Sequence, residues 1–132
     1  MATRIEAITA YRPRIKLGKR VEMDELVAFI ARSTGLNEGT IRQVLIELRD
    51  AALFYLLQGH SVGMEGLGTY TPTIALNGTF GVGHRADMKL KNGMNAPGAF
   101  SGPIINRGNI GKTGDELVAM WNEEHPNNLV TP

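Results

Sequence analysis

The residues that first suggest chemistry are closely spaced glycines. Gly63, Gly66 and Gly68 surround a single carboxylate in "HSVGMEGLGTYTPTI", residues 60–74. Such glycines cradle phosphate groups when they open a helix whose N-terminal amides face the ligand. Here they lead into alternating β-forming residues and Pro72, so the sequence predicts a strand at this point. We therefore expect the glycines to shape the backbone and to bind no nucleotide.

Other candidate catalytic or cofactor-binding motifs are incomplete. The segment "GNIGKTG", residues 108–114, resembles the end of a phosphate-binding loop, but the first glycine of that motif would fall on Asn106. The histidines lack the i, i+4 spacing that holds a metal on a helix; they are His60, His84 and His125. We expect a protein that is not an enzyme and that uses no cofactor, metal or small-molecule substrate.

Composition narrows the class of protein further. The chain of 132 residues fits one domain with a modest core, and it has no cysteine, which excludes disulfides and thiolate metal sites. Its apolar runs fall short of the roughly 20 residues that cross a membrane, so no membrane partner is expected. The basic start lacks the apolar block of a signal peptide, and a cytoplasmic protein is therefore predicted.

Positive charge is concentrated in two segments although the net charge is only +1. One segment precedes the first predicted helix and the other follows the glycine stretch. In "ADMKLKNG", residues 86–93, apolar and basic residues alternate, which predicts a strand with Lys89 and Lys91 on one face. These cations either neutralise DNA phosphates or keep flexible segments soluble. The candidate DNA contacts are Arg12, Arg14, Arg85, Lys89, Lys91, Arg107 and Lys112.

Two helices dominate the first half of the chain. Residues 24–33 predict a short helix followed by Gly35 in a left-handed position, and Asn37 is placed to cap a second helix. The second helix has apolar residues at three- and four-residue spacing and ends at Gly59. Its C-terminal half is apolar nearly all round, which predicts an interface with a second copy of the chain. The interface residues on this helix are Leu48, Leu53, Phe54, Leu56 and Leu57.

The second half of the chain is predicted to form strands, loops and one short helix. Residues 61–65 and 69–74 have the composition of strands, and Asn77-Gly78 suits a hairpin turn. Residues 92–112 show no period. A capping box at Thr113 begins the last helix, which ends at His125-Pro126.

The order of these elements and two sequence stretches resemble the HU/IHF family of bacterial histone-like DNA-binding proteins. The stretches are "DELVAFIARSTGL" and "GLGTY", and "YRPRIKLGKRVEMDEL" resembles the N-terminal extension of a divergent HU-like branch. The resemblance implies an α+β fold, in which a two-helix αα-corner precedes an antiparallel β-sheet with an arm and a short C-terminal helix, assembled as an intertwined dimer. The implied divisions are a basic N-terminal extension at 1–21, an HU-like DNA-binding domain at 22–126 and a tail at 127–132.

The resemblance also implies roles for single residues. Leu67 and Tyr70 would face the core of the dimer or its rim. In the family, a proline at the tip of each β-arm inserts between base steps. The arm-tip motif of the family is absent here. The nearest candidates are "LKNGMNAPGAF", residues 90–100, in which Pro97 would be the inserted residue, and "LNGTFGVGHR", residues 76–85. The basic final helix of the family is replaced by the acidic "DELVAMWNEEHP", residues 115–126.

The residues and the resemblance together predict a nucleoid-associated homodimer that binds double-stranded DNA. Contact would be mainly with backbone phosphates, with little sequence specificity. Two alternatives stay open. One is an HU-fold dimer that serves as a protein-interaction or structural module. The other is a sequence-specific regulator, in which "IARSTGLNEGTIRQVL", residues 30–45, forms a helix-turn-helix that places Thr40, Arg42 and Gln43 in the major groove.

Overall fold

The chain folds into two compact units in a computed structural model that describes residues 1–131. The central unit is Arg20–Phe100. The terminal unit combines Met1–Lys19 with the segment that begins at Ser101. This division differs from the expected extension, domain and tail, because the last helix lies with the N-terminal segment and not with the central strands.

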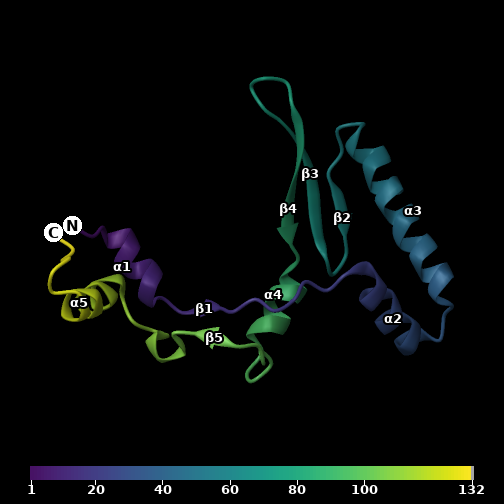
Figure 1. Cartoon of the computed structure of the whole chain (residues 1–132). Coiled ribbons are helices and arrows are strands. Elements are labelled where there is room, and N and C mark those ends of the chain that lie inside the picture. The colour runs from purple at the N-terminus through teal and green to yellow at the C-terminus, as the bar shows by residue number, and fades with distance from the viewer. Residues whose placement is uncertain (132) are drawn as a thin grey trace. The chain divides into compact units, whose positions relative to one another are not determined.

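The central unit begins with the predicted pair of helices, α2 (Met23–Thr34) and α3 (Glu38–Leu56) (Figure 1). Gly35 ends α2 with φ of 75°, the left-handed conformation that glycine adopts without strain. Asn37 then begins α3, because its side-chain oxygen accepts hydrogen bonds from the amides of Gly39 and Thr40. Val27 and Ile41 are buried where the helices meet. The predicted αα-corner is confirmed.

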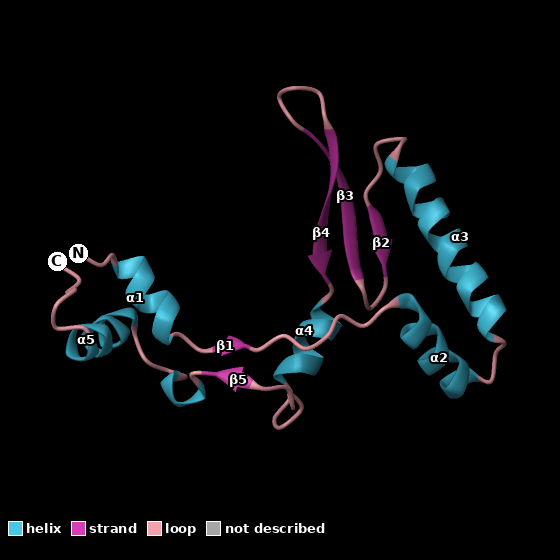
Figure 2. Cartoon of the chain, in the orientation of Figure 1, coloured by secondary structure: helices cyan, strands magenta, loops and turns pink. Residues whose placement is uncertain are grey.

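Three antiparallel strands follow, in the order β2 (Val62–Met64), β3 (Gly68–Ile74) and β4 (Phe80–Ala86) (Figure 2). The turn between β3 and β4 contains Asn77-Gly78, where Gly78 has φ of 86° and the Asn77 side chain accepts from the Thr79 amide at 3.0 Å. The predicted strands and their hairpin turn are confirmed.

Residues 86–93 do not form the predicted strand. They lie largely in a helix, α4 (Met88–Asn95), which begins where the Asp87 side chain accepts a hydrogen bond from the Lys89 amide at 2.7 Å. The alternation that suggested a strand covers only four residues. The cap formed by Asp87 stabilises the start of a helix, so a helix forms instead. Residues two apart on a helix project about 200° apart around its axis. Lys89 and Lys91 therefore do not share a face, and that prediction is wrong.

The terminal unit is assembled from both ends of the chain. From the N-terminal side come α1 (Arg4–Tyr11) and β1 (Arg14–Ile15). From the C-terminal side come β5 (Ile104–Ile105), a 3₁₀ turn at Arg107–Asn109 and α5 (Gly114–Glu124). β1 pairs with β5 in antiparallel fashion, and a parallel bridge joins Ala2 to Val130, so α1 and α5 belong to one unit in which both segments lie side by side (Figure 1).

Helix α1 was not predicted from the sequence. It begins with a capping box, in which Thr3 accepts from the Glu6 amide while the Thr3 amide donates to the Glu6 carboxylate at 2.7 Å. The hydrogen bond from the backbone amide of Thr3, followed by that from its hydroxyl, lowers the pKa of Glu6. The final helix α5 is confirmed, with the Thr113 side chain accepting from the Glu116 amide at 3.2 Å and its C-cap at His125.

Helices α1 and α5 pack together and run parallel, since their starts meet and their ends meet. At the starts, Arg4 pairs with Asp115 at 2.7 Å. At the ends, the Tyr11 hydroxyl donates to Glu124, and the Tyr11 ring meets Trp121 edge-on with a centroid distance of 6.3 Å. The hydrogen bond to Glu124 raises the pKa of Tyr11. Ala7 and Leu117 form the buried centre of this unit.

Candidate nucleic-acid interface

The β3–β4 hairpin has one polar and one apolar face, because facing residues of an antiparallel pair point to the same side. The polar face carries three successive cross-strand pairs, Thr69–Arg85, Thr71–Gly83 and Thr73–Gly81. The apolar face carries Tyr70–His84, Pro72–Val82 and Ile74–Phe80. The alternation "TYTPTI" contains this pattern, but the threonines are not among the DNA contacts predicted from the sequence.

The polar face offers groups that bind phosphate oxygens. Hydroxyls, guanidinium groups and backbone amides make most of the contacts between proteins and DNA backbones. Thr69, Thr71, Thr73 and Arg85 are all exposed. Within the described residues 1–131, the Arg85 side chain has no hydrogen-bond or ion-pair partner, so its donors are free to bind a ligand. Gly81 and Gly83 keep the β4 side of this face flat.

The glycine cluster lies in the turn that joins β2 to β3. Gly66 has φ of 83°, and the Leu67 amide donates to the Met64 carbonyl at 3.0 Å to close the turn. Gly68 has φ of 155°, and a side chain there would place its Cβ 2.4 Å from the Arg85 carbonyl oxygen. Gly66 and Gly68 therefore serve backbone geometry, as predicted, and lead into a strand, whereas Gly63 lies within β2 and an added Cβ there would meet nothing within 4 Å.

The two lysines of α4 differ in their surroundings. Lys89 reaches back over the β2–β3 turn, where its Nζ lies 3.9 Å from a carboxylate oxygen of Glu65. Both side chains are largely exposed, so this ion pair is weak and easily exchanged for another partner. Lys91 is exposed and makes no ion pair or side-chain hydrogen bond within residues 1–131.

The remaining candidate DNA contacts belong to the terminal unit. Arg12 and Arg107 have no side-chain partner within the described part of the chain. The Arg14 guanidinium instead donates to the Thr9 carbonyl at 3.1 Å, near the end of α1. Lys112 lies with its Nζ 3.6 Å from the Met120 sulfur. Arg107 lies in a 3₁₀ turn and not on a strand or arm. The predicted cations thus form two groups, one in each unit.

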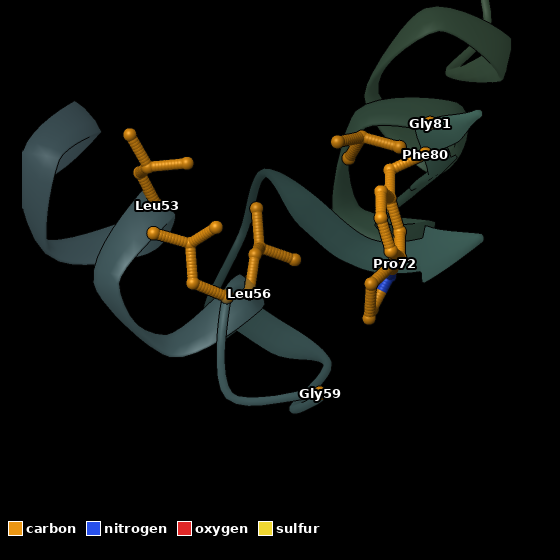
Figure 3. Close-up of a pocket in the computed structure, with 8 residues that line it drawn as sticks. Leu53, Leu56, Gly59, Pro72, Phe80 and Gly81 are labelled. Carbon is orange, nitrogen blue, oxygen red and sulfur yellow. The ribbon is translucent and has the colours of Figure 1, made fainter. Parts of the chain in front are cut away.

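Three of the predicted interface residues line a groove between α3 and the apolar face of the sheet; they are Leu53, Leu56 and Leu57. A groove of about 310 Å³ is lined by Leu53, Leu56, Leu57, Gly59, Pro72, Phe80, Gly81 and Val82. Figure 3 shows Leu53 and Leu56 on the helix side, and Pro72 and Phe80 on the sheet side. Leu57 remains 78% exposed and Phe80 80% exposed.

The other predicted interface residues are partly exposed. Leu48 and Phe54 are exposed on α3, and Leu67 is half exposed in the β2–β3 turn. Tyr70 is half-buried on the apolar face, where its ring lies 4.5 Å from that of His84 between centroids. Among the described residues, these side chains leave a broad apolar surface on α3 and the sheet.

Three details bear on how the central unit could contact DNA. Pro97 lies in a turn after α4 and not at a hairpin tip, so the suggestion that it is the inserted arm residue is wrong. The tip between β3 and β4 instead presents Leu76, which is fully exposed. Arg42, the candidate major-groove contact, is held in an ion pair with Asp24 of α2.

The helix that directly follows the hairpin is α4, which carries Lys89 and Lys91. The acidic α5 belongs to the terminal unit, so it does not take the place of a basic helix after the hairpin. Within residues 1–131, no group of three His, Asp or Glu side chains is arranged to hold a metal ion. None of the helices described here is long and apolar enough to cross a membrane.

A two-helix corner followed by an antiparallel sheet and a short basic helix defines an α+β protein of the HU type. The family model described as "HU domain fused to wHTH, Ig, or Glycine-rich motif" matches residues 3–92. Because this match covers more than half of the chain, the chain belongs to that family. No curated protein matches the chain. The matched range includes α1 and β1 and ends within α4.

Proposed function

We propose that the protein is a DNA-binding homodimer that contacts the duplex mainly through backbone phosphates. The observation that carries this proposal is the polar face of the β3–β4 hairpin. Its alternation places three threonine hydroxyls and the Arg85 guanidinium on the side of the sheet opposite the apolar groove. Family membership supports the same function, and a nucleoid location in a bacterial cytoplasm would follow from it.

Charge is distributed within the central unit so that the hairpin side favours an anion. Helices α2 and α3 carry most of the carboxylates of this unit. Between residues 57 and 100 the sequence contains two carboxylates, Glu65 and Asp87, and three cations, which are Arg85, Lys89 and Lys91. Asp87 is occupied as the cap of α4, and Glu65 is a weak partner of Lys89. Each phosphate neutralised contributes about −0.9 to the slope of log affinity against log salt concentration.

A second copy of the chain is the proposed cover of the apolar surface. Complete burial of a leucine or phenylalanine contributes roughly 1.5–3 kcal/mol, so half-exposed side chains gain about half of that each. Leu53, Phe54, Leu57 and Phe80 are all more than half exposed. Contiguous apolar patches of this kind usually mark an interface. Dimerisation would also double the polar hairpin face.

The exposed leucine at the hairpin tip suggests how the duplex would be deformed. Architectural proteins insert apolar side chains between base steps and unstack them, which bends the DNA. Leu76 has the required exposure and chemistry, and the loop around Asn77-Gly78 projects it from the sheet. We include insertion of Leu76 in the proposed binding mode.

A binding titration tests this function. The dissociation constant for a duplex of mixed sequence is measured at several salt concentrations for the wild type, Arg85→Ala and Lys91→Ala. Arg49→Ala is the matched control, because Arg49 is an exposed cation on α3 that pairs with Asp50. Each hairpin or α4 substitution should flatten the salt slope by about 1.8 per dimer, from two lost phosphate contacts. Arg49→Ala should leave the slope unchanged.

Two results would contradict the proposal. Absence of binding to any duplex at low salt would favour the structural or protein-interaction module. Strong preference for one duplex, abolished by Arg42→Ala, would favour the helix-turn-helix regulator. Under the proposed mode, Arg42 stays paired with Asp24 and its replacement has little effect on affinity.

A further inference from the structure

The C-terminal end of α1 is closed by side chains from a distant part of the sequence. The Asn106 side-chain amide donates to the carbonyl oxygens of Ala10 and Arg12, at 2.9 and 3.1 Å. The Asn109 amide donates to the Tyr11 carbonyl at 2.7 Å. The last carbonyls of a helix have no partner within the helix, and here two asparagines supply the missing donors.

The backbone around these asparagines is fixed in place. Asn106 has φ of 60°, a left-handed conformation that asparagine accepts more readily than most residues. Such conformations persist where surrounding contacts hold them. The adjoining β1–β5 ladder supplies these contacts, with Ile15 opposite Ile104 and the Lys16 amide donating to the Pro103 carbonyl at 3.0 Å. The 3₁₀ turn is thus held to the N-terminal segment on two sides.

Helix α1 has little capacity to fold without these partners. It is 8 residues long, and isolated helices shorter than about 12–15 residues are marginal in water. The buried residue of α1 is Ala7, and it is buried only when α1 packs in the unit that also contains α5. At the start of α1, Arg4 pairs with Asp115 of α5. At its end, the Tyr11 hydroxyl donates a hydrogen bond to Glu124 of α5.

We propose that the segment from residue 101 to residue 131 is an intramolecular clasp on which the folding of residues 3–16 depends. With the clasp closed, the N-terminal basic segment is a fixed helix and strand, and the backbone at Arg12 and Lys16 is held in place. With the clasp open, the same residues become a flexible basic arm. The family match at residues 3–92 contains the clasped elements but none of the clasp. This proposal does not rest on DNA binding.

Amide hydrogen exchange on the full chain tests the clasp. The double variant Asn106→Ala/Asn109→Ala is compared with Asn127→Ala, because the Asn127 amide makes no hydrogen bond within the described residues. Loss of one net hydrogen bond shifts an opening equilibrium by roughly two- to tenfold. The double variant loses three such bonds, so protection over residues 4–16 should fall by about eight- to a thousandfold. Protection of α3 should not change, which shows that the central unit stays folded.

Emission of the single tryptophan gives a second readout. Trp121 lies in the terminal unit beside Tyr11, so its emission reports the unfolding of that unit. The denaturant concentration at the midpoint of this unfolding should fall in the double variant and not in Asn127→Ala. Unchanged protection of residues 4–16 in the double variant would overturn the proposal. Equal loss of protection in α3 would also overturn it, because the clasp would then not be specific to the N-terminal segment.

An engineered disulfide decides whether the clasp closes within one copy. The chain has no cysteine, so Ala2→Cys/Val130→Cys introduces the only possible pair at a position where the two residues already bridge. Oxidation should give a band of monomer size on a denaturing gel without reductant, and the two thiols should no longer react with a maleimide. A dimer-sized band would show exchange of the N-terminal segment between copies, and a monomer-sized band whose thiols still react with the maleimide would show that the bridge does not form. Either result contradicts an intramolecular clasp.

Discussion

Replacement of Gly68 by alanine gives the sharpest test of how the hairpin is built. The Cβ of alanine would lie 2.4 Å from the Arg85 carbonyl oxygen and 2.6 Å from the His84 Nε2. The histidine side chain can rotate away, but the carbonyl oxygen belongs to the backbone of the paired strand. Relief of the contact therefore requires β3 and β4 to separate where Gly68 pairs with Ala86.

The expected cost has two parts. Forcing an extra carbon into a filled space typically costs about 1–3 kcal/mol. The backbone of Gly68, with φ of 155°, lies in a region that side chains disfavour by roughly another 1–3 kcal/mol. The sum, about 2–6 kcal/mol, is a large part of the roughly 5–15 kcal/mol that stabilises a typical domain. Valine at this position should be worse than alanine.

Urea denaturation followed by circular dichroism, at equal protein concentrations, measures this difference. Gly63→Ala is the matched control, because Gly63 lies in the neighbouring strand β2 and its added Cβ would meet nothing within 4 Å. The control should change the free energy of unfolding by less than about 1 kcal/mol. If Gly68→Ala were as stable as Gly63→Ala, the close approach of the strands at Gly68 would be refuted.

Other predictions concern assembly, DNA bending, nucleotides and pH. Phe54→Asp should give a monomer in light scattering, because a carboxylate would lose its hydration in the proposed interface; a persistent dimer would contradict that interface. Leu76→Ser should reduce duplex bending, measured by energy transfer between labelled ends, with a smaller loss of affinity; unchanged bending would exclude the tip as the inserted element. ATP and NAD should not raise the melting temperature, and thermal stabilisation by either would reopen the question of a phosphate site. Because the folded-state pKa of Tyr11 is raised, its stabilising contribution should be complete below about pH 10 and be lost as pH rises through that pKa. Unfolding of the terminal unit, followed by Trp121 emission, should therefore become easier at alkaline pH. Tyr11→Phe should remove this alkaline loss of stability, and an unchanged loss would assign it to another group.

The central unit could be predicted from local signals. Gly35 and Asn37 mark the turn between α2 and α3, and Asn77-Gly78 marks the hairpin, so periodicity and turn chemistry agree at each place. They disagree after residue 86, where a four-residue alternation suggested a strand. Asp87 caps a helix at this point, and the alternation gave no sign of it. Because a helix forms in place of a strand, Lys89 and Lys91 no longer point to one side.

The terminal unit could not be predicted in the same way, because its contacts join residues far apart in the chain. Asn106 and Asn109 have no local signature as helix caps, since the helix they cap ends at Tyr11. The polar hairpin face was accessible in principle, because three threonines alternate along β3. The predicted cations do not all share one surface, since Arg12, Arg14, Arg107 and Lys112 lie in one unit and Arg85, Lys89 and Lys91 in the other.

The bridge between Ala2 and Val130 has a mechanical consequence. A pull applied between these two points acts first on the contacts that join the N-terminal and C-terminal segments. While α1 and β1 remain attached to α5 and β5, no tension passes through α2, α3 or the hairpin. The central unit begins to carry load only after those contacts have separated. A stretching experiment that holds residues 2 and 130 should therefore record an extension from the terminal unit before any extension from the central one.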